Sequence, residues 1–406
     1  MGNRRWRRYL YPLITPKIFL KSREEKRILQ GHLWVFSNEI AQAEGPPEPG
    51  SIVDIYSHQR KFLGRGFCNP HSLIACRILT HKEEEIDLPF FARRVAQAKR
   101  FREKHFPRES SYRLIFGESD FLPGLIVDRY GEIFVVQSYC LGMDLLLEKI
   151  LPAIEENFSV KCMVKKNDSP LRAMENLVEE VEIVKGKMDV PIQITQGFEG
   201  KDLSFFIDPI QGQKSGFFLD QRENRERLKV YAPGKRVLDC YSYVGGFGVY
   251  AAASGAKEVT CVESSESACQ LIEKNFRVNG FKAQIIKEDV FTMLERANQE
   301  KRKFDIIVLD PPALAKSKKN LFASMRKYRQ LNQLALSVIE SGGLLISSSC
   351  SHHLPRANFL ELLCEAGSLA GKQLKLLEMR GQSRDHPVMI SMPETEYLKC
   401  AILQVD

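Results

Sequence analysis

The 406-residue sequence predicts an α/β fold for its second half, preceded by a β-rich module and a small α+β unit. After Lys201, short apolar runs alternate with segments of helical composition, which is typical of a parallel sheet with crossover helices. Before that point, β-like runs follow one another with turn residues between them. The length also favours more than one hydrophobic core, because single cores stop growing at about 250–300 residues.

Seven strands are expected in the second half of the chain. Their alternation with helices predicts that the first five are parallel, and two more strands close the chain. The expected ranges are 236–239, 258–263, 284–287, 304–309, 343–348, 374–379 and 397–405.

The first half is expected to hold two smaller units. β-like runs at 51–56, 62–67 and 72–79 form the β-rich module, and a helix at 87–105 looks like a connector. A hairpin with strands 124–128 and 133–137 around the turn 129–132, a helix at 145–156 and short strands to about 187 form a spacer-like α+β unit. The predicted domains are a basic extension 1–16, the β-rich domain 17–86, the connector and central domain 87–188, and the α/β domain 189–406.

Composition excludes several classes of protein. Hydrophobic residues make up 44% of the chain and charged residues 27%, which is typical of a globular protein. The longest N-terminal apolar run, Tyr9 to Ile14, contains Pro12 and is far shorter than the roughly 20 residues that cross a bilayer. The ten cysteines form no C-x-x-C pair, so neither a zinc site nor a disulfide framework is predicted. We therefore expect a cytoplasmic protein with no membrane partner and no metal.

Positive charge is concentrated in two places. The net charge is +8, and residues 1–30 hold nine basic and two acidic side chains, a net charge of +7. A second acid-free stretch contains Lys316, Lys318, Lys319, Arg326, Lys327 and Arg329. Basic patches are typical of proteins that bind the phosphate backbone of nucleic acids, although either patch alone could be solvated surface.

A glycine-rich turn and three acids predict a nucleoside cofactor site. The turn follows the first strand of the α/β domain, and glycines there let the backbone approach a ligand at a helix N-terminus. Glu263 ends the second strand, 24 residues after Asp239, where an acid can accept hydrogen bonds from both ribose hydroxyls. Each acid alone could be a helix cap or turn residue. The predicted cofactor-binding residues are Asp239, Ser242, Gly245, Gly246, Gly248, Glu263 and Asp289.

The fourth strand and its loop indicate which cofactor binds. The turn lacks the third spaced glycine of G-x-G-x-x-G, which argues against a dinucleotide. The fourth strand ends in Leu309-Asp310-Pro311-Pro312, a loop seen in methyltransferases that act on planar nitrogen-containing rings. Proline fixes the backbone so that the Asp310 carboxylate faces a base edge. The sequence therefore predicts S-adenosyl-L-methionine (SAM) as cofactor, and Pro311, Pro312, Lys316, Lys318 and Lys319 as substrate-binding residues.

Cys350 follows the fifth strand and is predicted to be the catalytic nucleophile. A buried, inert cysteine is the ordinary alternative. Carbon 5 of a pyrimidine is too weakly nucleophilic to take a methyl group unaided, so enzymes first add a thiolate at carbon 6. Asp310 would hold the N3 and N4 edge of the base. Ala313 stands where amino-group methylation usually needs a stacking aromatic residue. His352 and His353 are more often bystanders at such positions, so the base that removes the carbon 5 proton stays unassigned.

Long strings across the chain resemble those of the bacterial large-subunit ribosomal RNA cytosine-5 methyltransferases with an N-terminal PUA domain. The resemblance covers nearly the whole chain and is carried by the segments Gly31–Ser37, Phe116–Asp120, Leu122–Gly131, Gly212–Asn224 and Pro393–Lys399.

This resemblance implies a class I (Rossmann-like) methyltransferase domain whose last strand inserts antiparallel, preceded by a PUA domain and a central α+β domain. It implies a leading hairpin around Lys214 to Arg222 that folds over the cofactor, which adds Asp220 and Arg222 to the expected cofactor-binding residues. It also implies Cys350 as sole nucleophile and large-subunit ribosomal RNA as partner. Cys240-Tyr241 and Val244 depart from the expected Leu-Phe and Thr, which questions target choice more than activity.

Three other functions stay open at this stage. The chain could methylate carbon 5 of uracil, methylate a purine nitrogen, or act as a non-catalytic RNA-binding assembly factor. The presence of Asp239, Glu263, Asp310 and Cys350 together argues against the last, because a binding module needs none of them. A homodimer is also left open.

Overall fold

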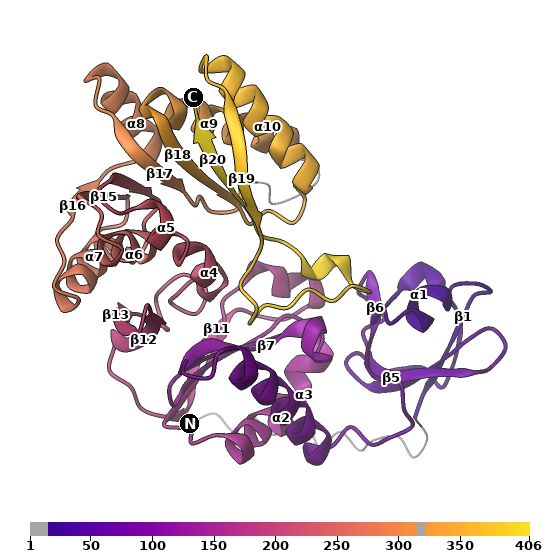
Figure 1. Cartoon of the computed structure of the whole chain (residues 1–406). Helices are drawn as coiled ribbons and strands as arrows, with labels where there is room; N and C mark the ends of the chain where they lie inside the picture. The colour runs from indigo at the N-terminus through magenta and orange to yellow at the C-terminus, as the bar shows by residue number, and fades with distance from the viewer. Residues whose placement is uncertain (1–14, 315–320) are drawn as a thin grey trace.

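The computed structural model describes residues 15–314 and 321–406 and arranges them in three sheets and one separate hairpin (Figure 1). The indigo N-terminal sheet lies at the right of the view, the central unit below, and the orange-to-yellow C-terminal sheet above. Residues 1–14, which hold most of the predicted basic extension, and the predicted substrate-binding residues Lys316, Lys318 and Lys319 lie outside the described residues.

The N-terminal unit is a six-stranded sheet with the order β2-β6-β5-β4-β1-β3. Its neighbouring strands are antiparallel except β1 and β4, which are parallel. Alternating buried side chains such as Val53, Ile55 and Ile78 form its core. The elements are β1 (Lys17–Leu20), α1 (Lys26–Leu29), β2 (Trp34–Phe36), η1 (Ser37–Glu39), β3 (Ile40–Glu44), β4 (Ile52–Tyr56), β5 (Phe62–Cys68) and β6 (Ile74–Thr80).

The central unit is a five-stranded sheet, ordered β11-β10-β9-β8-β7, with two packed helices. The Asp87 side chain caps the first of these helices by accepting a hydrogen bond from Phe90 N. The predicted hairpin turn is shorter than expected, since the two strands run up to Gly131 and Glu132. The elements are α2 (Leu88–His105), β7 (Ser111–Phe116), η2 (Gly117–Asp120), β8 (Leu125–Tyr130), β9 (Ile133–Ser138), α3 (Leu141–Asn157), β10 (Cys162–Asn167), η3 (Pro170–Glu175) and β11 (Glu180–Gly186).

A hairpin leads into the C-terminal domain, but not where it was expected. It is formed by β12 (Ile192–Phe198) and β13 (Lys201–Ile207). The segment from Lys214 to Arg222 is instead a loop followed by η4 (Leu219–Gln221) and the start of α4 (Arg222–Arg225). Tight turns within this segment explain the difference: Gly216 N donates to Gln213 O over 2.9 Å, and Gln221 N donates to Phe218 O over 3.3 Å. Backbone groups used in such turns do not pair with a second strand.

The C-terminal sheet confirms the predicted α/β fold. Its order is β16-β15-β14-β17-β18-β20-β19, with five parallel strands and β20 antiparallel between β18 and β19. Five strands match the predicted ranges within one residue, while β18 begins four residues earlier than expected and β20 two residues later. The strands are β14 (Arg236–Cys240), β15 (Glu258–Glu263), β16 (Gln284–Lys287), β17 (Phe304–Leu309), β18 (Ile339–Ser349), β19 (Leu374–Arg380) and β20 (Lys399–Val405).

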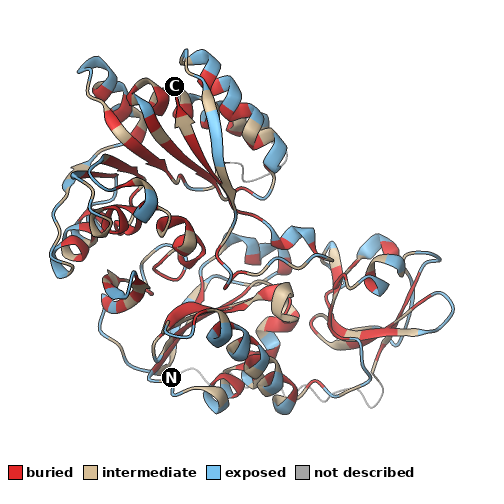
Figure 2. Cartoon of the chain, in the orientation of Figure 1, coloured by how far each residue is buried: buried red, intermediate tan, exposed pale blue. Residues whose placement is uncertain are grey.

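Helices cover both faces of this sheet, as its near-continuous apolar strands require. Neighbouring residues alternate between two cores: Val237 packs on one face and Leu238 on the other. Figure 2 shows the sheet as a largely buried layer between partly exposed helices. The remaining elements are α5 (Leu228–Tyr231), α6 (Gly246–Ala253), α7 (Glu266–Val278), α8 (Val290–Gln299), α9 (Leu321–Ser337), α10 (Arg356–Leu369) and η6 (Pro393–Thr395).

A return segment, residues 381–398 between β19 and β20, ties the C-terminal domain to both earlier units (Figure 1). Asp385 is fully buried; its Oδ2 accepts from Arg113 N over 2.9 Å and its carbonyl accepts from Arg102 Nη2 over 2.8 Å. Met392 is buried against the N-terminal sheet, where Leu33 N lies 3.1 Å from its sulfur. The three units are therefore held in a defined arrangement around this segment.

None of the helices in the described part of the chain combines the length and apolar character that crossing a membrane requires.

Candidate active site

Asp239 stabilises the glycine turn after β14. This side chain is 1% exposed, and its Oδ2 accepts a hydrogen bond of 2.9 Å from Gly248 N. Ser242 Oγ donates to Asp239 O over 2.7 Å, and Gly245 begins α6 with a φ of +79°, which favours glycine. Burial raises the pKa of Asp239 to about 7. The turn therefore has a fixed shape with a titratable acid beneath it.

Close packing explains the other two glycines. A Cβ on Gly248 would lie 2.7 Å from Cys261 Sγ, and a Cβ on Gly246 would lie 2.9 Å from Arg225 Nε. Side chains at these positions would push α6 away from β14. The glycines thus keep the N-terminus of α6 at the carboxyl edge of the sheet, where polar ligands bind.

The other two predicted cofactor acids lie at the ends of the next strands. Glu263 is oriented by backbone donors: Tyr243 N lies 3.0 Å from Oε2 and Ser265 N lies 2.9 Å from Oε1. Asp289 caps α8 by accepting hydrogen bonds from two backbone N–H groups. Because β14, β15 and β16 are adjacent and parallel, Asp239, Glu263 and Asp289 line one edge of the sheet. Asp289 therefore also acts as a helix cap, which was the alternative role considered for each acid.

Asp310 and Cys350 follow neighbouring parallel strands. β17 ends at Leu309, which pairs with Ser347 of β18, so the residues after both strands reach the same edge. Gln221 Nε2 donates to Asp310 Oδ1 over 2.9 Å. Burial, and then the charge of Asp220, raise the pKa of Asp310 to about 6. Next to it, Pro311 is buried and Pro312 is exposed.

Cys350 is one of the two described cysteines that are not buried, the other being the exposed Cys364. Burial of its side chain raises the pKa of the thiol above its ordinary value. Lys214 lowers this pKa, while Asp310 and Asp220 raise it. The thiolate, which is the reactive form, therefore depends on nearby positive charge.

Asp220 was predicted to bind the cofactor, and the structure shows a further role for it. It belongs to a hydrogen-bond network near Cys350. It is buried, and its Oδ2 accepts from Tyr397 OH over 2.5 Å and from Lys214 Nζ over 3.2 Å. Tyr397 belongs to the return segment, and its ring lies 5.3 Å from that of His352. Asp220 thus links the loop after β13 to the strand end that carries Cys350.

Arg222 does not reach the expected cofactor crevice and instead turns toward the central unit. Its Nη2 donates to Ser111 O, its Nη1 lies 3.6 Å from Glu109 Oε2, and the guanidinium lies over the ring of Phe106. The side chain is 1% exposed. The physical reason is that α4 presents this residue to the interface with β7, where a backbone carbonyl and a carboxylate satisfy its charge.

Sequence reasoning missed four side chains that the structure brings to this edge, namely Lys214, Gln221, Tyr243 and Tyr397. Three of them, Lys214, Gln221 and Tyr397, lie in the segments that carry the family resemblance. Their position there indicated that they could be functional. The partners of Gln221, Tyr243 and Tyr397 lie in distant segments, so the roles of these side chains could not be predicted from local sequence. Tyr243 shows this well: its OH accepts from Gln213 N while its own N donates to Glu263.

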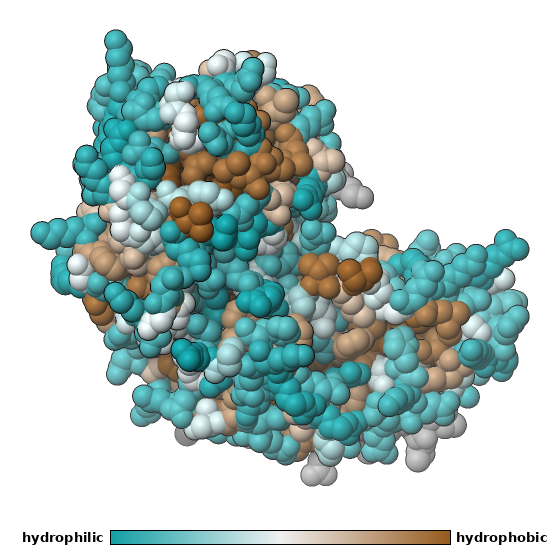
Figure 3. Space-filling view, in the orientation of Figure 1, coloured by the Kyte–Doolittle hydropathy of each residue, from teal (hydrophilic) through white to brown (hydrophobic). Residues whose placement is uncertain are grey.

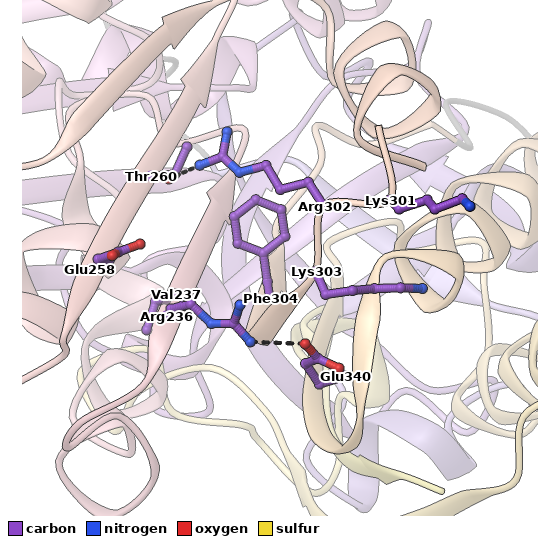
Figure 4. A pocket seen from close by; sticks show the side chains of 9 residues that line it. All are labelled: Arg236, Val237, Glu258, Thr260, Lys301, Arg302, Lys303, Phe304 and Glu340. Atoms are coloured by element: carbon purple, nitrogen blue, oxygen red, sulfur yellow. Dashed lines mark hydrogen bonds and ion pairs between the residues drawn. The ribbon is translucent and has the colours of Figure 1, made fainter. Parts of the chain in front are cut away.

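A cavity lies at the opposite end of the strands. Its volume is about 270 Å³, and Figure 4 shows Arg236 reaching toward Glu340 and Arg302 toward Thr260. Arg236 begins β14, Arg302 precedes β17, and Thr260 and Glu340 lie near the starts of β15 and β18, so the cavity is at the amino edge. By contrast, β20 ends at the top of Figure 1 and is antiparallel to β18, so the carboxyl edge faces the middle of the molecule. There the surface shows an open recess between the upper domain and the N-terminal module (Figure 3).

Comparison with known proteins decides the family. A protein of Aeromonas salmonicida called ribosomal RNA large subunit methyltransferase I is 36% identical over 95% of this chain and 98% of its own length. The protein of the same name from Tolumonas auensis is 37% identical over 96% of this chain and its own full length. The chain belongs to the ribosomal RNA large subunit methyltransferase I family. Family models agree, with a PUA-like domain at residues 18–81 and the model called Conserved hypothetical protein 95 at residues 224–370.

Two solved structures share the fold of this family member along its length. A methyltransferase called SMU.776, solved with SAH, is 23% identical, covers 96% of this chain and 99% of its own, and has a TM-score of 0.81. A SAM-dependent methyltransferase from Streptococcus mutans is 22% identical with the same coverage and a TM-score of 0.79. The predicted architecture, a PUA-like domain followed by a Rossmann-like methyltransferase fold, is confirmed.

Proposed function

We propose that this chain methylates carbon 5 of a cytosine in large-subunit ribosomal RNA, with SAM as methyl donor and Cys350 as nucleophile. The observation that carries the proposal is the placement of Asp310 and Cys350 after adjacent parallel strands, at the edge that also holds the glycine turn. The names of the family members support the substrate class.

The residues at the carboxyl edge fit SAM. Glu263, held by Tyr243 N and Ser265 N, offers a carboxylate to the ribose hydroxyls, and the N-terminus of α6 offers backbone donors. The absence of a Cβ at Gly246 and Gly248 keeps that backbone close to the edge. Bound SAM supplies an electrophilic methyl group.

Cys350 and Asp310 have different roles toward the base: Cys350 forms a covalent bond to it and Asp310 holds it in place. The thiolate of Cys350 adds to carbon 6, which makes carbon 5 nucleophilic enough to accept a methyl group. After methylation the carbon 5 proton is removed and the bond between sulfur and carbon 6 breaks, which returns the thiolate. Asp310 holds the pairing edge of the base during these steps.

The raised pKa of Asp310 makes the protonated acid, the form complementary to cytosine, accessible near neutral pH. N3 of cytosine is a hydrogen-bond acceptor, so a protonated carboxyl is complementary to it, whereas N3–H of uracil needs a carboxylate. Since the pKa of Asp310 is raised to about 6, protonation at pH 7 costs about 1.4 kcal/mol, against more than 4 kcal/mol at an ordinary pKa. Methylation of an exocyclic amino group is disfavoured by Ala313 after the two prolines.

Nucleoside analysis tests the proposal. Purified enzyme with SAM labelled in the methyl group should transfer label to unmodified large-subunit ribosomal RNA, and digestion should yield labelled 5-methylcytidine. Labelled 5-methyluridine or a methylated purine would contradict the choice of base. The absence of any transfer to naked RNA and to ribosomal particles alike would contradict the proposed activity.

A further inference from the structure

Lys214 occupies a loop that is anchored from two sides. On one side, Lys166 Nζ donates to Gly212 O, and Ser215 Oγ lies 2.9 Å from Tyr130 OH, which fixes the loop to the central unit. On the other side, Gln213 N donates to Tyr243 OH over 2.9 Å, which fixes the loop to the glycine turn after β14. Lys214 itself adopts a φ of +51°, which is uncommon for a residue other than glycine. The loop thus holds this side chain in one place at a conformational cost.

The Lys214 ammonium group forms an ion pair with Asp220 and stays partly exposed to solvent. Its Nζ lies 3.2 Å from Asp220 Oδ2 and 4.6 Å from the centre of the Phe218 ring, while the side chain is 42% exposed. Burial lowers the pKa of Lys214, but the carboxylate of Asp220 outweighs this, and the net pKa is raised. Lys214 is therefore a stable cation at neutral pH.

Geometry brings this cation to the strand end that carries Cys350. Lys214 Nζ lies 6.0 Å from the centre of the Tyr397 ring, and that ring lies 5.3 Å from the ring of His352, two residues after Cys350. Tyr397 OH and Lys214 share the same oxygen of Asp220. The charged or titratable groups that face Cys350 from the surrounding elements are Lys214, Asp220, Asp310, Tyr328, His352, Tyr397 and Lys399.

The other two basic groups are poorly suited to stabilise a thiolate. Lys399 Nζ donates to Ser351 O and Tyr397 O, each over 2.7 Å, so it ties the end of β18 to the start of β20; burial lowers its pKa to about 8. Burial lowers the pKa of His352 to about 4, so it is neutral at pH 7. Lys399 is still mostly protonated at pH 7 and interacts with the thiol, but Lys214 is the charged side chain that lowers the pKa of Cys350 most.

We propose that Lys214 is a positioning residue that stabilises the thiolate of Cys350, with Asp220 and Tyr397 holding the lysine in place. On ionisation the thiol proton leaves to water, and Lys214 keeps its own proton. The sulfur electron pair is then free to form the bond to carbon 6. The inference rests on the proposed function, in which Cys350 is the nucleophile.

Site-resolved alkylation tests this without RNA or turnover. The free enzyme would be treated with iodoacetamide between pH 7 and 11, because the pKa of Cys350 is already raised. The rate at Cys350 would be read by peptide mass spectrometry, which separates it from Cys364. In Lys214→Met the midpoint of the profile should rise by about one pH unit, and Lys214→Arg should restore it. Lys229→Met is the matched control, because Lys229 is 44% exposed and paired with Glu199 far from the site. SAM affinity and circular dichroism would verify the fold of each variant.

Two results would overturn the inference. One is an unchanged midpoint in Lys214→Met with retained fold. The other is an unchanged midpoint together with a loss of SAM affinity, which would show that the cation serves the cofactor. A raised midpoint in an enzyme that methylates no RNA would support the coupling between Lys214 and Cys350 and overturn the proposed function instead.

Discussion

Gln221 donates a hydrogen bond of 2.9 Å from Nε2 to Oδ1 of Asp310, joining η4 to the loop that follows β17, 89 residues later. Burial favours the neutral acid, while this hydrogen bond favours the carboxylate. The balance raises the pKa of Asp310 to about 6, close to neutral pH. Asp310, which we propose contacts the base, can therefore change its protonation state at little cost.

The preference for cytosine should depend on pH through Asp310. If the protonated acid binds N3, the preference is complete below pH 6 and is lost as pH rises through 6, by about tenfold for each further unit. Affinities of two RNAs that differ only by cytosine or uracil at the target would be compared from pH 5.5 to 8. In Asp310→Asn the amide donates at every pH, so the preference should be flat. A pH-independent preference in the unaltered enzyme would show that the protonation of Asp310 does not set the choice of base.

Glu263 should contribute strongly to SAM affinity. Hydrogen bonds to a charged group contribute about 1.5–3 kcal/mol, so Glu263→Ala should weaken binding roughly ten- to a hundredfold in calorimetry. Glu258→Ala is a suitable control, because Glu258 begins the same strand at the opposite edge and is exposed. Equal affinities for the two variants would remove Glu263 from the cofactor site.

Asp239 should make the protein less stable at alkaline pH. Its folded pKa, about 7, is above the ordinary 3.8, so the folded state binds the proton more tightly and loses stability as pH rises from about 4 to 7. Asp239→Asn removes this cost and should raise Tm by about 2–4 °C at pH 8, with a smaller gain at pH 5. Asp305→Asn should lower Tm at pH 8, because Arg236 and its hydrogen bonds depress the pKa of Asp305. A lower Tm for Asp239→Asn at pH 8 would contradict the account.

RNA affinity should depend on exposed basic residues of the N-terminal sheet. Deleting that sheet is a poor test, because Met392 of the return segment is buried against it. Arg23 and Lys26 are exposed, and their joint replacement by alanine should flatten the slope of log K against log salt by about 1.4–1.8. Replacing Lys257 and Lys301, which are exposed near the amino edge of the C-terminal sheet, is the control. An unchanged slope in the first variant would place the RNA surface elsewhere.

Local sequence patterns predicted the C-terminal sheet well, because most of its strands have apolar centres and the first five alternate with helices. The ends of β14, β15 and β17 were placed within one residue, which located Asp239, Glu263 and Asp310 correctly relative to the sheet. The start of β18 was missed because Gly342 and Gly343 interrupt its apolar pattern.

Long-range contacts could not be predicted in the same way. The path of the return segment depends on the burial of Asp385 and Met392 against units that lie hundreds of residues earlier, and no local pattern encodes those partners. The direction of Arg222 was not predicted for the same reason, since its side chain donates to Ser111 O and forms an ion pair with Glu109 in the central unit. The network of Lys214, Asp220 and Tyr397 likewise joins two segments that only the fold brings together.

Covalent trapping at Cys350 tests the central claim most directly. RNA with 5-fluorocytosine at the target should be methylated once and then stay attached. Carbon 5 then carries fluorine in place of a proton, so the elimination that releases the enzyme is blocked. The complex, made with labelled SAM, would be resolved on a denaturing gel and mapped by mass spectrometry. The account predicts a shifted, labelled band whose adduct maps to Cys350, and no band with Cys350→Ala although that variant keeps its SAM affinity. Full methylation activity in Cys350→Ala, or an adduct at another residue, would contradict it.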